Sequence, residues 1–162
     1  MSSEMKPIEL TCEYSRNPLG IDTPQPRFSW LLESAKRGCM QSAYQILVAS
    51  SQEKLKNDIG DKWDSEKVTS DESVNITYGG TPLLSGEKCY WKVRVWNEDE
   101  EVSSYGPAAT FEMGLLNKSD WQGVWIGAEK DISSPLFRKE FKLTKEIKQA
   151  RVYISGIGYY EL

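Results

Sequence analysis

Residues 83–113 have the sequence LLSGEKCYWKVRVWNEDEEVSSYGPAATFEM, and this stretch decides the fold. In its first half, two sets of side chains alternate. The apolar set is Cys89, Trp91, Val93 and Val95, and the mixed set is Tyr90, Lys92, Arg94 and Trp96. A period of two is typical of a strand with one face in a core and the other facing outward. A slip of one residue would bury Lys92 and Arg94, so the pattern also fixes the register.

The second half of the stretch predicts a turn and a return strand. Residues 97–101 include four consecutive acids and are too polar to continue inward, which indicates a turn at the surface. We expect the second strand over residues 102–113, interrupted by Gly106 and Pro107, because such a pair favours an edge or a bulge. The stretch is therefore predicted to be a long antiparallel hairpin.

The chain before this hairpin contains five further segments that predict short strands, residues 7–14, 27–33, 41–50, 61–68 and 73–78. Within them, alternation predicts that Tyr44, Ile46 and Val48 face inward. It also predicts that Phe28, Trp30 and Leu32 face one way, and that Val74, Ile76 and Tyr78 share one side of their strand. Residues 51–59 predict one short helix, which Ser51 can cap. About seven short strands between Gly, Pro, Asn and Asp turns predict an all-β antiparallel sandwich.

Composition and charge limit the class of protein. The 162 residues are 39% hydrophobic and 27% charged, which is normal for a globular protein. No apolar run approaches the roughly 18 residues that a membrane helix needs, so we expect no membrane contact. The net charge of −4 argues against nucleic acid as a partner. The N-terminus lacks the features of a signal peptide, so we expect a cytoplasmic protein, or an exported one from which the signal has been removed.

The charge also divides the chain. Residues 1–116 carry a net charge of −6 and residues 117–162 a net charge of +2. We therefore predict a sandwich domain over residues 1–116. Residues 117–162 are predicted to be a linker and the first strands, 136–143 and 147–162, of an incomplete second sandwich, since two or three strands cannot close a core alone. Unpaired strand edges recruit other chains, so we expect either disorder over residues 136–162 or strand pairing between copies.

The residue types that carry chemistry are sparse. The chain has no His, which excludes His-dependent triads and His-ligated metals. Cys12, Cys39 and Cys89 are widely spaced and are interpreted as free thiols, with a Cys12–Cys39 bridge left open as an alternative. Glycosidases need two carboxyl groups flanking a bond, and no spacing here pairs two acids. Asp61, Asp64 and Glu66 could be imagined as calcium ligands, but surface charge is the favoured interpretation. We predict no catalytic residue, no metal and no cofactor.

Aromatic residues are the remaining candidates for ligand contact. Sugars stack on exposed aromatic rings, and we predict Tyr90, Trp96 and Tyr105 on the outward face of the hairpin as candidate carbohydrate contacts. The alternative interpretation is that these rings cover a seam between domains.

Several strings together resemble one family, and they span the chain in order: residues 17–22 (NPLGID), 26–30 (PRFSW), 41–46 (QSAYQI), 63–65 (WDS), 90–96 (YWKVRVW), 111–115 (FEMGL), 120–121 (DW) and 125–127 (WIG). The chain resembles the N-terminal part of bacterial α-L-rhamnosidases, which are inverting glycoside hydrolases. The resemblance implies a fibronectin-III/immunoglobulin-like sandwich followed by a second β-sandwich. Cys89 stands where such modules have the tyrosine of a corner motif.

The resemblance also implies a function. The catalytic acids of the family lie in a downstream barrel, so none of them corresponds to a position here. We expect a noncatalytic accessory region that braces or orients the remainder of an enzyme that removes terminal rhamnose from glycosides. The alternatives are a stand-alone carbohydrate-binding module, which would bind rhamnosides, and a protein-interaction module.

Overall fold

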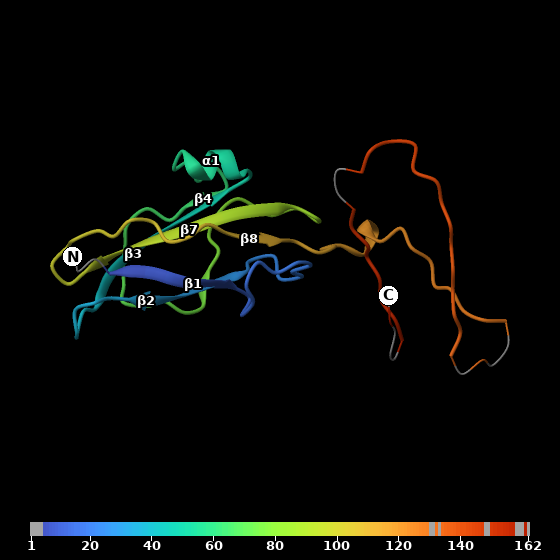
Figure 1. Ribbon diagram of the computed structural model, residues 1–162, viewed down its shortest axis with the longest axis horizontal. Helices are drawn as coiled ribbons and strands as arrows, with labels where there is room; N and C mark the ends of the chain where they lie inside the picture. Colours follow the sequence, from blue (N-terminus) through green and yellow to red (C-terminus); the bar gives the residue numbers. More distant parts are fainter. Residues whose placement is uncertain (1–4, 130–131, 133, 148–149, 158–160, 162) are drawn as a thin grey trace. The chain divides into compact units, whose positions relative to one another are not determined.

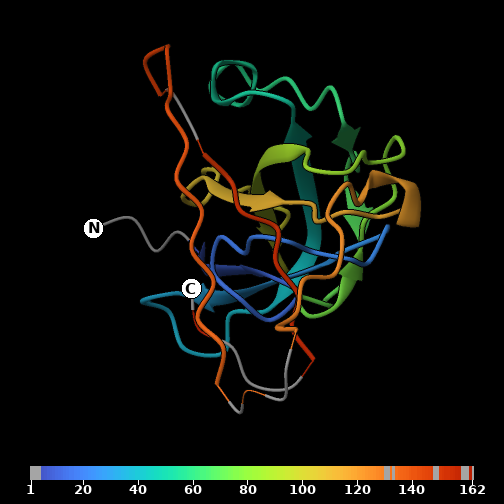
Figure 2. The ribbon, with the colours of Figure 1, turned by 90° about the vertical axis from the view of Figure 1, so that its right-hand side faces the viewer.

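Two antiparallel sheets form the first of two units in the computed structural model, which describes residues 5–129, 132, 134–147, 150–157 and 161. The units comprise residues 1–123 and 124–162. One sheet has the order β1-β2-β6, made of β1 (Lys6–Cys12), β2 (Arg27–Glu33) and β6 (Ile76–Thr77). The other has the order β4-β3-β7-β8, with β5 also paired to β3; its strands are β3 (Gln41–Ala49), β4 (Trp63–Asp64), β5 (Val68–Thr69), β7 (Lys88–Asn97) and β8 (Ala109–Glu112). Figures 1 and 2 show the two layers of the first unit from the side and from the end. The predicted all-β sandwich is confirmed.

The predicted hairpin is present, and its first strand is the longest in the sheet. β7 pairs along most of its length with β3, so that Val93 faces Ile46 and Trp91 faces Val48. The return strand is shorter than predicted, since β8 covers Ala109–Glu112 and Val102 makes only an isolated bridge to Trp96. The interruption lies at Gly106, whose N–H donates to the Val93 carbonyl at 2.8 Å. A Cβ there would lie 2.6 Å from the Pro7 carbonyl oxygen, so only glycine lets this segment pass β1.

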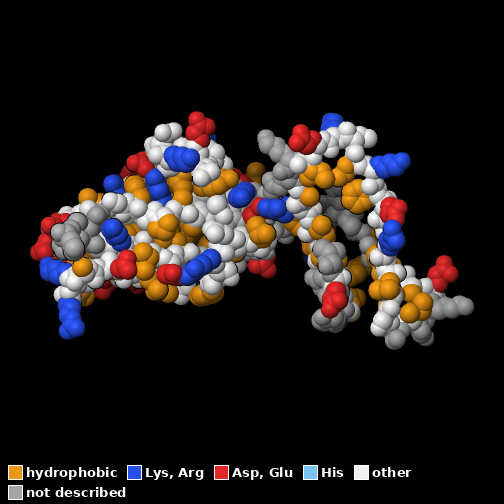
Figure 3. Space-filling model, viewed as in Figure 1, with side chains coloured by type: hydrophobic (Ala, Val, Ile, Leu, Met, Phe, Trp, Pro, Cys, Tyr) orange, Lys and Arg blue, Asp and Glu red, His pale blue; other side chains and the backbone are white. Residues whose placement is uncertain are grey.

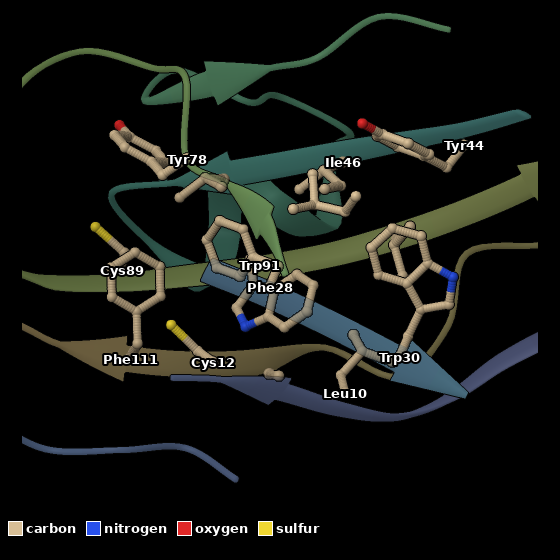
Figure 4. Close-up of a cluster of buried hydrophobic side chains, with 14 of the residues drawn as sticks. Leu10, Cys12, Phe28, Trp30, Tyr44, Ile46, Tyr78, Cys89, Trp91 and Phe111 are labelled. Carbon is tan, nitrogen blue, oxygen red and sulfur yellow. The ribbon is translucent and has the colours of Figure 1, made fainter. Parts of the chain in front are cut away.

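The core lies between the sheets and is rich in aromatic rings (Figure 4). Phe28 of β2 lies at its centre, with ring centroids 4.4 Å from Trp91 and 5.6 Å from Phe111. Trp30 is buried beside it, and its indole N–H donates to Gln41 Oε1 at 3.0 Å. The predicted common face of Phe28 and Trp30 is confirmed, and it is the face that lies in the core.

A tyrosine closes one corner of the sandwich, although not at the position considered from sequence. The Tyr78 hydroxyl lies 2.8 Å from the Thr81 carbonyl and 3.1 Å from the Lys62 carbonyl. Burial raises the pKa of Tyr78 to about 12. Cys89, the position at which the corner was in question, has its side chain buried in the core.

The cysteines are free thiols, as predicted, and the alternative Cys12–Cys39 bridge is not formed. Cys12 and Cys89 are buried, and Cys39 is half-buried. Desolvation raises the pKa of Cys89 to about 12, so this thiol stays protonated at neutral pH.

Some predicted details are wrong. Val74 is 57% exposed and does not share the buried side of Ile76 and Tyr78, because the left-handed backbone of Asn75 (φ 58°) breaks the alternation between them. Leu32 is 37% exposed near the end of β2. The single strand predicted over residues 61–68 is divided into β4 and β5, separated by a left-handed residue, Glu66 (φ 53°).

The predicted helix is confirmed as α1 (Gln52–Lys56). The Ser51 hydroxyl accepts from the Lys54 N–H at 3.2 Å and caps the first turn. Leu55 is its only buried residue, and it packs on Leu47 of β3. The helix therefore attaches to the outer face of the β4-β3-β7-β8 sheet.

The predicted strands are absent from the part of the second unit that the structure describes. No strand or helix is present in the described residues of 124–162, and Leu136 is 99% exposed. Residues 148–149, 158–160 and 162 of the predicted strand 147–162 lie outside the described residues. The predicted domain boundary after residue 116 stays a prediction.

Candidate functional site

The three predicted carbohydrate contacts lie on one face, the outer face of the β4-β3-β7-β8 sheet. Tyr90 and Trp96 belong to β7 and lie opposite Ala49 and Ala43 of β3. Tyr105 follows β7 in the chain and packs with Tyr90 against the cluster around Leu55. All three rings are half-buried. The alternation in the sequence thus predicted the common face of Tyr90 and Trp96, whereas Tyr105 lies between β7 and β8, outside any strand.

Lys92 departs from the prediction that this face is open to solvent. It is only 9% exposed, because α1 covers it. Its ammonium donates to the Leu55 carbonyl at 2.7 Å, pairs with the Asp58 carboxylate and lies 4.4 Å from the centroid of the Tyr105 ring. A buried ammonium needs such partners, and here all of them come from outside its own strand.

Arg94, two residues further along β7, continues the same arrangement. Its guanidinium carbon lies 4.9 Å from the Tyr105 centroid and 5.2 Å from the Trp96 centroid, and its Nε donates to Gln45 Oε1 at 2.8 Å. Lys67 Nζ lies 5.1 Å from the Trp96 centroid and pairs with Glu100. We name the residues Lys67, Trp96, Arg94, Tyr105 and Lys92 the cation ladder.

The cation ladder determines what the aromatic rings can do. Each contact of a cation with a ring contributes roughly 0.5–2 kcal/mol, depending on its exposure. Tyr90 has a similar contact, with Lys88 Nζ 5.5 Å from its centroid. A sugar that stacked on Trp96 or Tyr105 would compete with the cations already over these rings. The arrangement therefore suits a braced protein surface better than an open sugar platform.

Two of the three acids considered as calcium ligands, Asp61 and Asp64, hold local structure through their carboxylates. The Asp61 carboxylate accepts from the Ser50 N–H at 2.9 Å, from the Ser50 hydroxyl at 2.8 Å and from Lys54 Nζ at 2.8 Å. Desolvation raises its pKa, but these contacts outweigh it and lower the pKa of Asp61 to about 2. Asp64 accepts from Gln45 Nε2 and from the Glu66 N–H.

The acidic segment 97–101 forms the predicted turn at the end of β7. Glu98 accepts from the Met40 N–H at 2.9 Å, and Lys36 pairs with both Glu98 and Asp99. The hydrogen bond from Met40 is the main cause that lowers the pKa of Glu98. The turn is therefore attached to the loop between β2 and β3.

Paired carboxylates in a pocket would be needed for glycoside hydrolysis. A shallow depression on the β1-β2-β6 side is lined by one acid, Glu9, with Thr11, Ser29, Trp30, Leu31 and Val74. Among the described residues there is no group of three or more His, Cys, Asp or Glu side chains that could hold a metal. In the same part of the chain, no helix is long and apolar enough to span a bilayer.

Sequence reasoning missed the partners that complete this face. Gln45 bridges Arg94 and Asp64, and Asp58 pairs with Lys92. Alternation along β3 places Gln45 outward, but Asp58 follows α1 in a loop that no periodicity describes.

Comparison with known proteins agrees with the fold. The model of one family, described as the Rha78A-like N-terminal immunoglobulin domain, matches residues 7–117. An α-L-rhamnosidase of Formosa agariphila is 42% identical over 159 residues, which cover 91% of this chain and 17% of that protein. An α-L-rhamnosidase of Alteromonas sp. is 40% identical over 159 residues, and this match covers 90% of this chain and 17% of that protein. The chain thus spans less than a fifth of these curated relatives.

Solved structures give the same result. The α-L-rhamnosidase from Dictyoglumus thermophilum matches with a TM-score of 0.75 and 41% identity, over 77% of this chain and 14% of that one. The Streptomyces avermitilis α-L-rhamnosidase, solved with L-rhamnose, matches with a TM-score of 0.73 and 42% identity, over 76% of this chain and 12% of that one. The matched sequence, the two-sheet fold and these neighbours agree: the chain belongs to the family of Rha78A-like N-terminal immunoglobulin domains.

Proposed function

We propose that this chain is a noncatalytic N-terminal accessory region of an α-L-rhamnosidase, an enzyme that removes terminal rhamnose from glycosides. Its partner would be the remainder of that enzyme, which it braces or orients. The observation that carries the proposal is the similarity of about 90% of this chain to α-L-rhamnosidases that are more than five times its length.

The chemistry of the described residues supports the noncatalytic role. Inverting glycosidases hold two carboxyl groups roughly 6.5–9.5 Å apart around the bond. The depression on the β1-β2-β6 side offers a single carboxylate, Glu9, and the acids on the opposite sheet accept hydrogen bonds from their own loops.

Carbohydrate binding by Tyr90, Trp96 and Tyr105 is the second candidate. Its support is that the three rings gather on one partly exposed face. Against it, the cations of the ladder already lie over the rings of Trp96 and Tyr105.

Two measurements on the purified chain separate the candidates. A chromogenic rhamnoside should give no turnover, and real turnover would overturn the accessory role. Titration with rhamnose and rhamnosides, followed by tryptophan fluorescence, should give no saturable change. A saturable change that Trp96→Ala abolishes and Trp121→Ala keeps would favour the binding module, since Trp121 lies outside the ladder and is 44% exposed.

We also propose that copies of this chain associate by strand pairing through residues 136–162. Exposed apolar side chains in this segment, such as Leu136 and Phe141, support it. Sedimentation should detect association that a chain ending at Gly123 lacks, and equal behaviour of the two chains would contradict it.

A further inference from the structure

The segment that leaves the sandwich is bonded to the loop before β7, although the two lie far apart in the sequence. Ser85 is the central residue of this contact. Its hydroxyl donates to Asp120 Oδ2 and accepts from the Leu116 N–H at 2.8 Å. We name Ser85, Leu116, Asn117 and Asp120 the exit latch.

Asp120 completes the exit latch from the other side. The same carboxylate oxygen accepts from the Asn117 N–H and from Asn117 Nδ2, both at 3.1 Å. The Asp120 N–H in turn donates to the Asn117 carbonyl at 3.1 Å, which closes the single turn of η1 (Lys118–Asp120). The hydrogen bond from Ser85 is the main cause that lowers the pKa of Asp120, so the carboxylate is charged at neutral pH.

Backbone bonds hold the residues that lead into the exit latch. The Gly114 N–H donates to the Ile21 carbonyl at 2.7 Å, and the Gly86 N–H donates to the Gly114 carbonyl at 3.0 Å. Leu116 packs against the main core. The segment is therefore attached by backbone, side-chain and apolar contacts beyond the end of β8.

The composition of residues 117–120 (NKSD) is that of a flexible linker, and the family model ends at residue 117. The first unit nevertheless continues to Gly123. A flexible tether would leave these polar groups to water, whereas here they bond to a loop about 30 residues away.

We propose that the exit latch makes residues 114–121 a rigid part of the sandwich, so that the chain leaves it from a fixed point at Trp121. The consequence, that an accessory domain can orient the next part of the enzyme, rests on the proposed function. The rigidity itself does not, because it concerns contacts within the first unit alone.

Amide hydrogen exchange of the 162-residue chain, monitored by NMR for each residue, tests the exit latch. In the wild type, the Leu116 and Asn117 amides should exchange more than roughly tenfold slower than unprotected amides. Ser85→Ala should accelerate exchange at Leu116 about five- to tenfold, since one hydrogen bond is lost. Ser85→Thr, which keeps the hydroxyl, should restore protection. Ser119→Ala, a neighbouring exposed serine, is the matched control and should change nothing.

Unprotected exchange at Leu116 in the wild type would overturn the proposal, as would a rate that Ser85→Ala leaves unchanged. If Ser85→Ala fails to fold, Asp120→Ala tests the latch from the other side, through the rate at Asn117. The buried Val93 amide reports whether the core of each variant is intact. Turnover of a rhamnoside would contradict the proposed function and leave this exchange pattern untouched, so the two failures are distinguishable.

Discussion

Phe28 and Trp91 join the two sheets, with their ring centroids 4.4 Å apart and both side chains fully buried. Phe28 also contacts Phe111, Trp63 and Tyr78. One ring from β2 thus reaches residues on three other strands and the corner. This contact is the centre of the sandwich (Figure 4).

Truncation of this ring should severely weaken the fold. Phe28→Ala removes the buried ring and leaves a cavity, so we expect the free energy of unfolding to fall by about 3–5 kcal/mol. Leu31→Ala is the control on the same strand, because Leu31 is 59% exposed, and it should change stability by less than about 0.5 kcal/mol. Urea unfolding measures both, and similar values for the two variants would contradict this view of the core.

Lys92 should stabilise the attachment of α1 mainly through its hydrogen bond to the Leu55 carbonyl and its contact with the Tyr105 ring, and only slightly through its ion pair with Asp58. Lys92→Met keeps the stem but removes the bond to the Leu55 carbonyl and the contact with Tyr105, so we expect a loss of about 1–2 kcal/mol. Asp58→Asn should have an effect below about 0.5 kcal/mol, because the Asp58 side chain is 63% exposed. Equal effects of the two variants, measured by chemical unfolding, would mean that the ion pair dominates instead.

Local patterns in the sequence predicted the elements of the fold well. The alternation in β7 identified the face that holds Trp91 and Val93, because side chains of a strand alternate whatever their partners are. The same rule predicted the common face of Tyr90 and Trp96. The rule also predicted that Lys92 lies on the outer face of β7, and the structure agrees on the face, although not on the exposure of this side chain.

The burial of Lys92 could not be predicted, because it depends on Leu55, which is 37 residues away. The exit latch depends likewise on Ser85 and Asp120, 35 residues apart. Alternation predicted Val74 on the same side as Ile76 and Tyr78, but the left-handed backbone of Asn75 (φ 58°) interrupts the alternation. Figure 3 shows acidic and basic side chains interspersed on the visible face of the first unit, an arrangement that the net charge alone does not describe.

Gly80 should be irreplaceable for steric reasons. A Cβ at this position would lie 2.2 Å from the Lys62 carbonyl oxygen and 2.5 Å from Trp63 Cβ, so the loop that holds Tyr78 would have to move. We expect Gly80→Ala to destabilise the protein by about 1–3 kcal/mol. Gly123→Ala is the matched control, since nothing lies within 4 Å of a Cβ there. Thermal unfolding should give a lower Tm for Gly80→Ala than for the wild type and an unchanged Tm for Gly123→Ala.

Asp61 should make stability depend on pH in the acid range. Its pKa is about 2 in the folded protein against an ordinary value of 3.8, because desolvation, which raises it, is outweighed by the bonds that Lys54 and Ser50 donate to the charged form. A lowered pKa contributes stability that is complete above about pH 4 and is lost as the pH falls towards 2. Allowing for the partial exposure of this side chain, we expect a contribution of about 1 kcal/mol. Urea unfolding between about pH 2 and 6 should show a flatter profile for Asp61→Asn than for the wild type. Asp71→Asn, at an exposed aspartate, should keep the profile of the wild type. If Asp61→Asn retained the full slope, the contacts of this carboxylate with Ser50 and Lys54 would have no part in holding the loop after α1.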